Sequence, residues 1–214
     1  MNLVQLKKWP SAISKKFKKA RETSKFKIIQ ADESNLECFF IMIELTGGHY
    51  KGQTHILEFR AKCSTRTNVL FPFSPPMVHF ITKIFHTNVS TEGGICVDIL
   101  NDISKWTPVY DFDTVMTSIE LLLVSPNNAS PYNVTASNKY MACNATYKKN
   151  SQFIKNHTLL DKVFNESFEP FDKFCMEYHN KNNTEILKKF MPAFNAAYDD
   201  MPKIDNLNIE EKKE

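Results

Sequence analysis

The sequence predicts an α+β protein in which one helix precedes a small antiparallel sheet and further helices follow it. Short apolar, partly β-branched runs alternate with glycine- and proline-containing turns between residues 26 and 82. All five glycines fall between residues 47 and 94, and the rest of the chain shows helical spacing at several places. With 42% hydrophobic and 24% charged residues, the composition is that of an ordinary globular protein.

The N-terminal segment predicts an amphipathic helix that ends near Thr23. Pro10 is compatible with a first helical position, and Ile13, Phe17 and Ala20 recur at the i, i+4 and i+7 spacing of one helix face. The opposite face is rich in lysine. An antiparallel four-stranded meander is the simplest assembly of the short runs that follow. Its strands are expected at residues 26–30, 36–45, 54–61 and 77–82.

The C-terminal half is predicted to be mostly helical. Asp111 and Asp113 are suited to cap the first of these helices, which stops before a proline, and Thr158 and Asp161 have the spacing of a capping box. We expect Pro192 to interrupt the last helix and the acidic end of the chain to fray. The helices are expected at residues 111–125, 134–142, 145–157 and 184–198.

Charge and cysteine usage exclude several classes of function. Of the 27 basic residues only three are arginine, the side chain best suited to read bases, so no specific nucleic-acid binding is predicted. The five cysteines form no C-x-x-C pair and no metal-binding motif is present, so neither a disulfide framework nor a metal site is expected. Without a long apolar run or a signal peptide, we expect no membrane partner and a cytoplasmic, possibly nuclear, protein.

One cysteine stands in a segment suited to chemistry. Cys96 follows Gly93 and Gly94, and its apolar neighbours can anchor the segment to the core while the thiol stays accessible. A single free cysteine is more often a small core residue, so this position alone decides nothing. The residues around it change that balance.

The motifs on either side of Cys96 occur in a fixed order. An aromatic-proline stretch comes first, then a His-x-Asn tripeptide, then Cys96 eight residues after the asparagine, then a Trp-x-Pro and finally a Pro-Asn with a serine before a second proline. The residues are Phe71, Pro72, Phe73, Ser74, Pro75 and Pro76; His86, Thr87 and Asn88; Cys96; Trp106, Thr107 and Pro108; and Pro126, Asn127, Ser130 and Pro131.

In this order and spacing the chain resembles the ubiquitin-conjugating enzyme family over about residues 3 to 157. The resemblance implies the ubiquitin-conjugating fold, with residues 1–157 as the conjugating core and residues 158–214 as a helical C-terminal extension with an acidic tail. The chain departs from the family pattern at Thr87, which replaces a proline, and in two longer loops. These loops lie between Phe59 and Phe71 and between Cys96 and Trp106.

The resemblance implies an acyl transfer through a cysteine thioester. Cys96 would accept the C-terminal carboxyl of ubiquitin from the activating enzyme and pass it to a substrate lysine. Asn88 would donate to the oxyanion of the tetrahedral intermediate or fix the active-site loop. Asp98 and Ser130 match positions near the incoming amine, and His86 is expected to brace the loop rather than act as a base.

The resemblance also implies partners. No bound cofactor is needed, because ATP is consumed by the upstream activating enzyme. Ligase contacts are expected at Phe73, Pro108 and Val109, and protein substrates would supply the lysine. Residues 1–30 hold eight lysines and Arg21 against one acid, so the first helix could meet an acidic surface of the activating enzyme. The lysines expected there are Lys7, Lys8, Lys15 and Lys16.

Three other interpretations stay open at the level of sequence. A conjugating enzyme for a ubiquitin-like protein would use the same residues. A cysteine hydrolase would need a histidine beside Cys96, for which His86 is the nearby candidate. A non-catalytic member of the fold would bind ubiquitin-like proteins without transferring them, although such members usually lack the cysteine.

Overall fold

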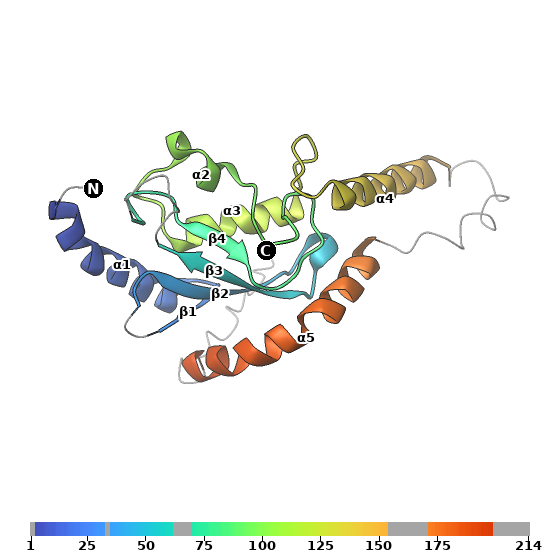
Figure 1. The fold of residues 1–214 in the computed structure, drawn as a ribbon. Coiled ribbons are helices and arrows are strands. Elements are labelled where there is room, and N and C mark those ends of the chain that lie inside the picture. Colours follow the sequence, from blue (N-terminus) through green and yellow to red (C-terminus); the bar gives the residue numbers. More distant parts are fainter. Residues whose placement is uncertain (1–2, 33–34, 62–69, 154–170, 199–214) are drawn as a thin grey trace, which may run out of the picture.

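The computed structural model describes residues 3–32, 35–61, 70–153 and 171–198, with backbone alone at 3–8 and 144–153. Four strands form one antiparallel meander in the order β1-β2-β3-β4 (Figure 1). Ile41 of β2 pairs with both Ile28 and Leu57, which fixes the register across the first three strands. The predicted meander is therefore confirmed. Its strands are β1 (Lys27–Gln30), β2 (Cys38–Glu44), β3 (Thr54–Arg60) and β4 (Met77–Phe80).

Both faces of the sheet are covered. Phe39 and Ile41 of β2 point into the main core, whereas Met42 belongs to a second apolar cluster on the opposite face. Helices α1 (Leu3–Thr23) and α3 (Phe112–Val124) contribute to the main core, and α5 (Phe171–Tyr198) covers the other face (Figure 1). Because side chains alternate along a strand, the two-sided burial explains why β2 and β3 read as nearly continuous apolar runs.

The expected start of the first helix is wrong, because α1 begins at Leu3 and Pro10 lies inside it rather than at its first position. Trp9 and Ile13 on either side of Pro10 are buried in the main core, which offsets the backbone hydrogen bond that proline removes.

The end of α1 and the cap of α3 form as predicted. Helix α1 ends at Thr23, and Asp111 caps α3 by accepting a hydrogen bond from the Thr114 N–H at 3.1 Å. Asp113 instead accepts a hydrogen bond from the Ser24 hydroxyl and so ties α3 to the end of α1. Three short helical segments lie in the connections: η1 (Gly48–Tyr50), α2 (Asp98–Asn101) and η2 (Ile103–Lys105).

Two expectations for the C-terminal helices are wrong. The predicted break between residues 142 and 145 is absent, because α4 runs without interruption from Val134 to Phe153. Asn144 at that point lowers helix propensity by only a few tenths of a kcal/mol, which is too little to end a helix. The predicted capping box of Thr158 and Asp161 and the acidic tail lie outside the described residues.

Helix α5 begins thirteen residues earlier than Thr184 and passes through Pro192 without ending. Pro192 is exposed, while Phe190, Met191 and Phe194 on either side of it pack on the sheet. The apolar burial of these three side chains offsets the one backbone hydrogen bond that proline removes. None of the helices in the described ranges is long and apolar enough to cross a membrane.

Candidate active site

Cys96 lies on a short extended segment between a glycine turn and α2. Its backbone N–H donates to the Asn88 carbonyl at 2.9 Å, and Ile95 forms an antiparallel bridge with Val89. The side chain of Cys96 is half-buried. The cysteine is therefore held by its backbone while the thiol remains partly open to solvent.

The turn before Cys96 requires glycine. Gly93 has φ +92°, and a Cβ atom there would lie 2.2 Å from the Phe80 carbonyl oxygen. The Gly93 carbonyl accepts from the Phe80 N–H at 2.8 Å, which attaches the turn to the end of β4. This close backbone contact places the segment that carries Cys96 beside the sheet.

Asn88 joins the two loops that surround Cys96. Its side chain is fully buried, donating through Nδ2 to the Asn127 carbonyl at 2.8 Å and accepting through Oδ1 from the Asn127 N–H at 2.8 Å. Nδ2 also donates to the Ser130 carbonyl at 3.4 Å. Because both amide hydrogens have partners inside the protein, this geometry favours the loop-fixing role over donation to an oxyanion.

His86 is buried beneath the same loop. Its Nδ1 accepts a hydrogen bond from the Asn88 N–H at 3.0 Å, which assigns the ring proton to Nε2. Burial lowers the pKa of His86 to about 4, against a smaller opposing effect of the Leu122 and Leu123 carbonyls. A neutral imidazole that already accepts from the backbone braces the loop and is poorly placed to deprotonate Cys96.

Thr87 compensates chemically for the proline it replaces. Its hydroxyl donates to Asn128 Oδ1 at 3.3 Å, and its carbonyl accepts from the N–H groups of Tyr132 and Asn133, each at 2.9 Å. Proline would restrict the backbone here, whereas threonine uses hydrogen bonds to the facing loop for the same purpose. The departure from the expected motif therefore leaves the loop anchored.

Asp98 and Ser130, the two residues predicted to lie near an incoming amine, belong to different segments of the site. Asp98 is the first residue of α2, and its largely exposed carboxylate pairs with Lys105. Ser130 is exposed, and its carbonyl is the partner of Asn88. The carboxylate and the hydroxyl thus both lie at the surface, where an incoming amine can reach them.

Tyr132 is a site residue that the sequence reasoning missed. The charge of the neighbouring Cys96 raises the pKa of Tyr132, and burial and a hydrogen bond with Cys96 act in the same direction. The side chain remains 51% exposed. Its position two residues after Ser130 gave no signal, because only the folded loop brings its hydroxyl to the thiol.

The comparisons with known proteins agree with this arrangement. The family model for ubiquitin-conjugating enzyme matches residues 12–155, which is most of the described chain and includes Cys96. The chain belongs to the ubiquitin-conjugating enzyme family. The fold and the N-terminal helix, four-stranded sheet and C-terminal helices are those expected for this family.

Three relatives of this ubiquitin-conjugating enzyme family member come from a nematode and two fungi. The chain is 37% identical over 130 residues to ubiquitin-conjugating enzyme E2 1 of Caenorhabditis elegans, covering 61% of this chain and 62% of that protein. It is 47% identical over 79 residues to ubiquitin-conjugating enzyme E2 2 of Fusarium solani, covering 37% and 51%. It is 39% identical over 101 residues to ubiquitin-conjugating enzyme E2-20 kDa of Schizosaccharomyces pombe, covering 47% and 53%. The chain thus spans between about half and three fifths of these curated relatives.

The two loops expected to contact a ligase lie beside each other. The Trp106 indole N–H donates to the Pro72 carbonyl at 3.0 Å and so ties the loop of Pro108 and Val109 to the segment of Phe73. Val109 is 81% exposed, an unusual state for a branched apolar side chain. This conjugating-enzyme core therefore presents both predicted ligase-contact segments on one surface.

The lysines expected to meet the activating enzyme differ in their environments. Lys15 is exposed, whereas the Lys16 ammonium donates to the Tyr110 carbonyl at 2.8 Å and to the Val109 carbonyl at 3.4 Å. Burial lowers the pKa of Lys16. Lys16 thus supports the loop of Val109, where a ligase contact is predicted, and the side chains of Lys7 and Lys8 lie outside the described residues.

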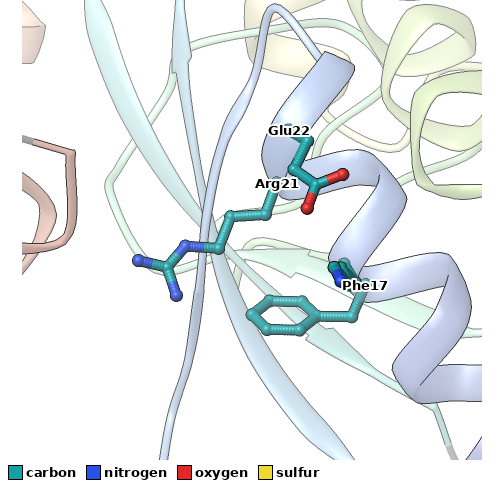
Figure 2. Close-up of a pocket in the computed structure, with 4 residues that line it drawn as sticks. Phe17, Arg21 and Glu22 are labelled. Atoms are coloured by element: carbon teal, nitrogen blue, oxygen red, sulfur yellow. The ribbon is translucent and has the colours of Figure 1, made fainter. Parts of the chain in front are cut away.

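A surface hollow lies on α1 and contains none of the predicted site residues. Phe17, Lys18, Arg21 and Glu22 line it (Figure 2). The Arg21 side chain extends away from Glu22, and its guanidinium donates to the Ala197 carbonyl in the last turn of α5 at 2.9 Å (Figure 2). The residues that line the hollow all belong to α1. Within the described residues no group of histidine, cysteine, aspartate or glutamate side chains is arranged to hold a metal ion.

Proposed function

We propose that this chain accepts ubiquitin as a thioester on Cys96 and transfers it to a substrate lysine. The observation that carries the proposal is the placement of a half-exposed thiol between two loops fixed by Asn88, with the family match across the same residues. A free cysteine thiol with a pKa near 8.5 is a few per cent thiolate at neutral pH, which is sufficient for exchange between thioesters. No Cys-His dyad is required.

The first step exchanges one thioester for another. The Cys96 sulfur attacks the carbonyl carbon of ubiquitin held on the activating enzyme, a new C–S bond forms, and the activating enzyme's cysteine leaves as a thiolate. ATP is consumed upstream, in forming the first thioester, so the chain itself needs no bound cofactor.

The second step is aminolysis. The lysine nitrogen attacks the thioester carbon, the C–S bond breaks, and the amine proton is released as the Cys96 thiol is restored. A lysine of pKa about 10.4 is neutral about one time in a thousand at pH 7.4, so the site must favour the neutral amine. Asp98, Ser130 and Tyr132 are the polar side chains positioned to orient it.

Buried His86 argues against the hydrolase alternative. Its Nδ1 already accepts from the Asn88 N–H, and the ring is fully buried and held in its neutral form. Transfer to an amine, rather than to water activated by a histidine, is therefore the function that this geometry supports. A ubiquitin-like protein in place of ubiquitin would use the same residues.

The test combines activating enzyme, ATP and ubiquitin with the full chain. Wild type should form an adduct that a thiol reductant removes, and Cys96→Ser should form an ester that resists the reductant. Cys38→Ser is the matched control, because burial raises the pKa of the Cys38 thiol to about 11 and so keeps it protonated. An adduct that depends on Cys38, or no reductant-labile adduct at all, would contradict the proposal. The same assay with a ubiquitin-like protein and its own activating enzyme tests whether the chain accepts that protein in place of ubiquitin.

We further propose a division at residue 157 and a viral origin. The family match ends at residue 155, which supports a conjugating core over residues 1–157 and an extension over residues 158–214. Abundant lysine and asparagine with scarce arginine indicate an AT-rich genome, and the long extension resembles the ubiquitin-conjugating enzyme of African swine fever virus. A viral enzyme would act in host cytoplasm and possibly nucleus. A gene flanked by cellular genes would refute the viral origin, and a tagged chain absent from the cytoplasm would refute the location.

A further inference from the structure

Helix α5 reaches the segment that leads into the active-site loop. Its C-terminal half covers the outer face of the sheet, and its N-terminal half lies next to η1 and the first half of α4 (Figure 1). Residues 83–85 leave β4 and continue directly into His86 and Asn88. A contact between α5 and residues 83–85 is therefore one to three residues away from His86 and three to five residues away from Asn88 along the chain.

Asn183 of α5 makes that contact. Its side chain is fully buried, with Oδ1 accepting from the Lys83 N–H at 2.6 Å and Nδ2 donating to the Lys83 carbonyl at 2.8 Å. The amide thus satisfies both backbone groups of one residue, as a neighbouring strand would. Leaving both groups buried without partners is costly, so this pair holds Lys83 at a defined position.

Phe85 is fixed by the same helix. Its ring lies 4.9 Å from the ring of Phe174 and 5.5 Å from that of Tyr178, measured between centroids. Its carbonyl accepts from the Tyr50 hydroxyl at 3.0 Å, and Tyr50 packs in turn on Phe171 at 6.3 Å. Both the side chain and the backbone of Phe85 therefore depend on residues of α5 or on residues packed against it.

The contacts continue from Phe85 to the thiol without a gap. His86, the next residue, accepts from the Asn88 N–H, and the Asn88 carbonyl accepts from the Cys96 N–H. We propose that α5 is a built-in support for the active-site loop, in which Asn183 and Phe174 act as positioning residues for Asn88 and Cys96. The role in transfer rests on the proposed function, whereas the effect on the loop does not.

The first test separates the two steps of the reaction. Asn183→Ala should leave charging of Cys96 close to wild type and slow discharge of the charged chain to free lysine by about 10-fold, the size of one lost buried hydrogen-bonded pair. Asn195→Ala is the matched control, since Asn195 is an exposed asparagine on the same helix. Unchanged discharge in Asn183→Ala, or equal losses in charging and discharge, would overturn the proposal.

A double-mutant cycle tests whether Asn183 acts through Asn88. Asn88→Ala should retain charging and lose discharge, and adding Asn183→Ala to it should cause little further loss. Independent effects that multiply would show that Asn183 does not act through the loop. The second variant, Phe174→Leu, keeps apolar volume but removes the ring contact with Phe85, and it should show the same selective loss if Asn183→Ala does not fold.

Amide hydrogen exchange supplies a readout that needs no ubiquitin. In Asn183→Ala the amides of Asn88 and Cys96 should exchange about 10-fold faster than in wild type, whereas those of β2 should not change. If the amides of Asn88 and Cys96 exchange at the same rate in Asn183→Ala as in wild type, the support role is refuted even if transfer is slowed. A wild-type chain that cannot be charged would refute the proposed function alone, because exchange still decides whether α5 holds the loop.

Discussion

The thiol of Cys96 depends on neighbours that are buried and uncharged. Asn88 and His86 have no exposed surface. Asn88 binds the backbone of the facing loop through both polar atoms of its amide, and His86 accepts from the Asn88 N–H through Nδ1. Such groups stabilise one loop conformation because any other would leave polar atoms buried without partners. The side chains of Asp98, Ser130 and Tyr132 are exposed, and their polar groups lie at the surface.

A pH prediction follows from His86. Because its pKa is about 4 in the folded chain and about 6.5 when unfolded, the unfolded chain binds a proton between these values and the folded chain does not. The stabilisation is therefore complete above pH 6.5 and is lost as pH falls towards 4. We expect His86 to account for about 2.5 kcal/mol of the unfolding free energy lost between pH 7 and pH ~4.5.

His86→Asn removes this titration while its carbonyl oxygen can still accept from the Asn88 N–H. Urea unfolding at both pH values should show a smaller loss for His86→Asn than for wild type. His55, whose pKa burial also lowers, contributes equally to both chains. An identical pH dependence in the two proteins would show that His86 is not buried in its neutral form.

At the scale of elements, the lysines of α1 differ in whether they contact the rest of the protein or the solvent. Lys16 donates to the loop that carries Val109, and Lys19 pairs with Asp111 at 3.3 Å. Lys15 is exposed and has its charge available to a partner. One helix therefore both supports the loop of Val109 and presents positive charge at the surface.

The different environments of Lys15 and Lys16 predict that their substitution changes the salt dependence of Cys96 charging to different extents. Lys15→Ala should slow charging of Cys96 about 2-fold at low salt, because one exposed charge contributes well below 1 kcal/mol to docking. The difference from wild type should vanish near 1 M salt, where the Debye length is about 3 Å. Lys16→Ala is the comparison, and its charging should change less with salt than that of Lys15→Ala. Initial charging rates at several salt concentrations test this, and a larger salt effect for Lys16 would contradict it.

At the scale of the molecule, the sheet has an apolar cluster on each side. The main core lies between the sheet, α1 and α3, and Phe194 of α5 lies fully buried against Met42 and Ile56 on the other side. Tyr198 also binds the edge of β1, accepting from the Ile28 N–H at 2.6 Å and donating to the Ile28 carbonyl at 2.9 Å. Helix α5 is thus packed into the fold as firmly as the helices of the core.

Removing the Phe194 side chain should therefore destabilise the whole chain. Phe194→Ala is expected to cost about 3 to 5 kcal/mol of unfolding free energy, because it leaves a cavity between α5 and the sheet. Lys189→Ala, at an exposed position of α5, should change stability by less than about 0.5 kcal/mol. Urea unfolding followed by both far-UV and fluorescence signals should give one transition. Two separate transitions, with the second unaffected by Phe194→Ala, would show that α5 is an independent unit.

The sequence alone determined the four strands, the first helix and the nucleophile candidate. The strands are marked in the sequence by short apolar runs between glycine- and proline-containing turns, and the interval from Asn88 to Cys96 is a property of the chain itself. Local patterns of this kind need no knowledge of what packs against them.

Only the tertiary structure decided what depends on distant residues. Lys83 and Asn183 are a hundred positions apart, Lys16 binds a loop more than ninety positions away, and Tyr132 reaches Cys96 from another loop. The continuation of α5 through Pro192 also depends on tertiary contacts, because side chains that pack on the sheet offset the backbone hydrogen bond that proline removes. Hydrogen bonds and apolar contacts between such residues exist only after the chain has folded, so no local sequence pattern predicts them.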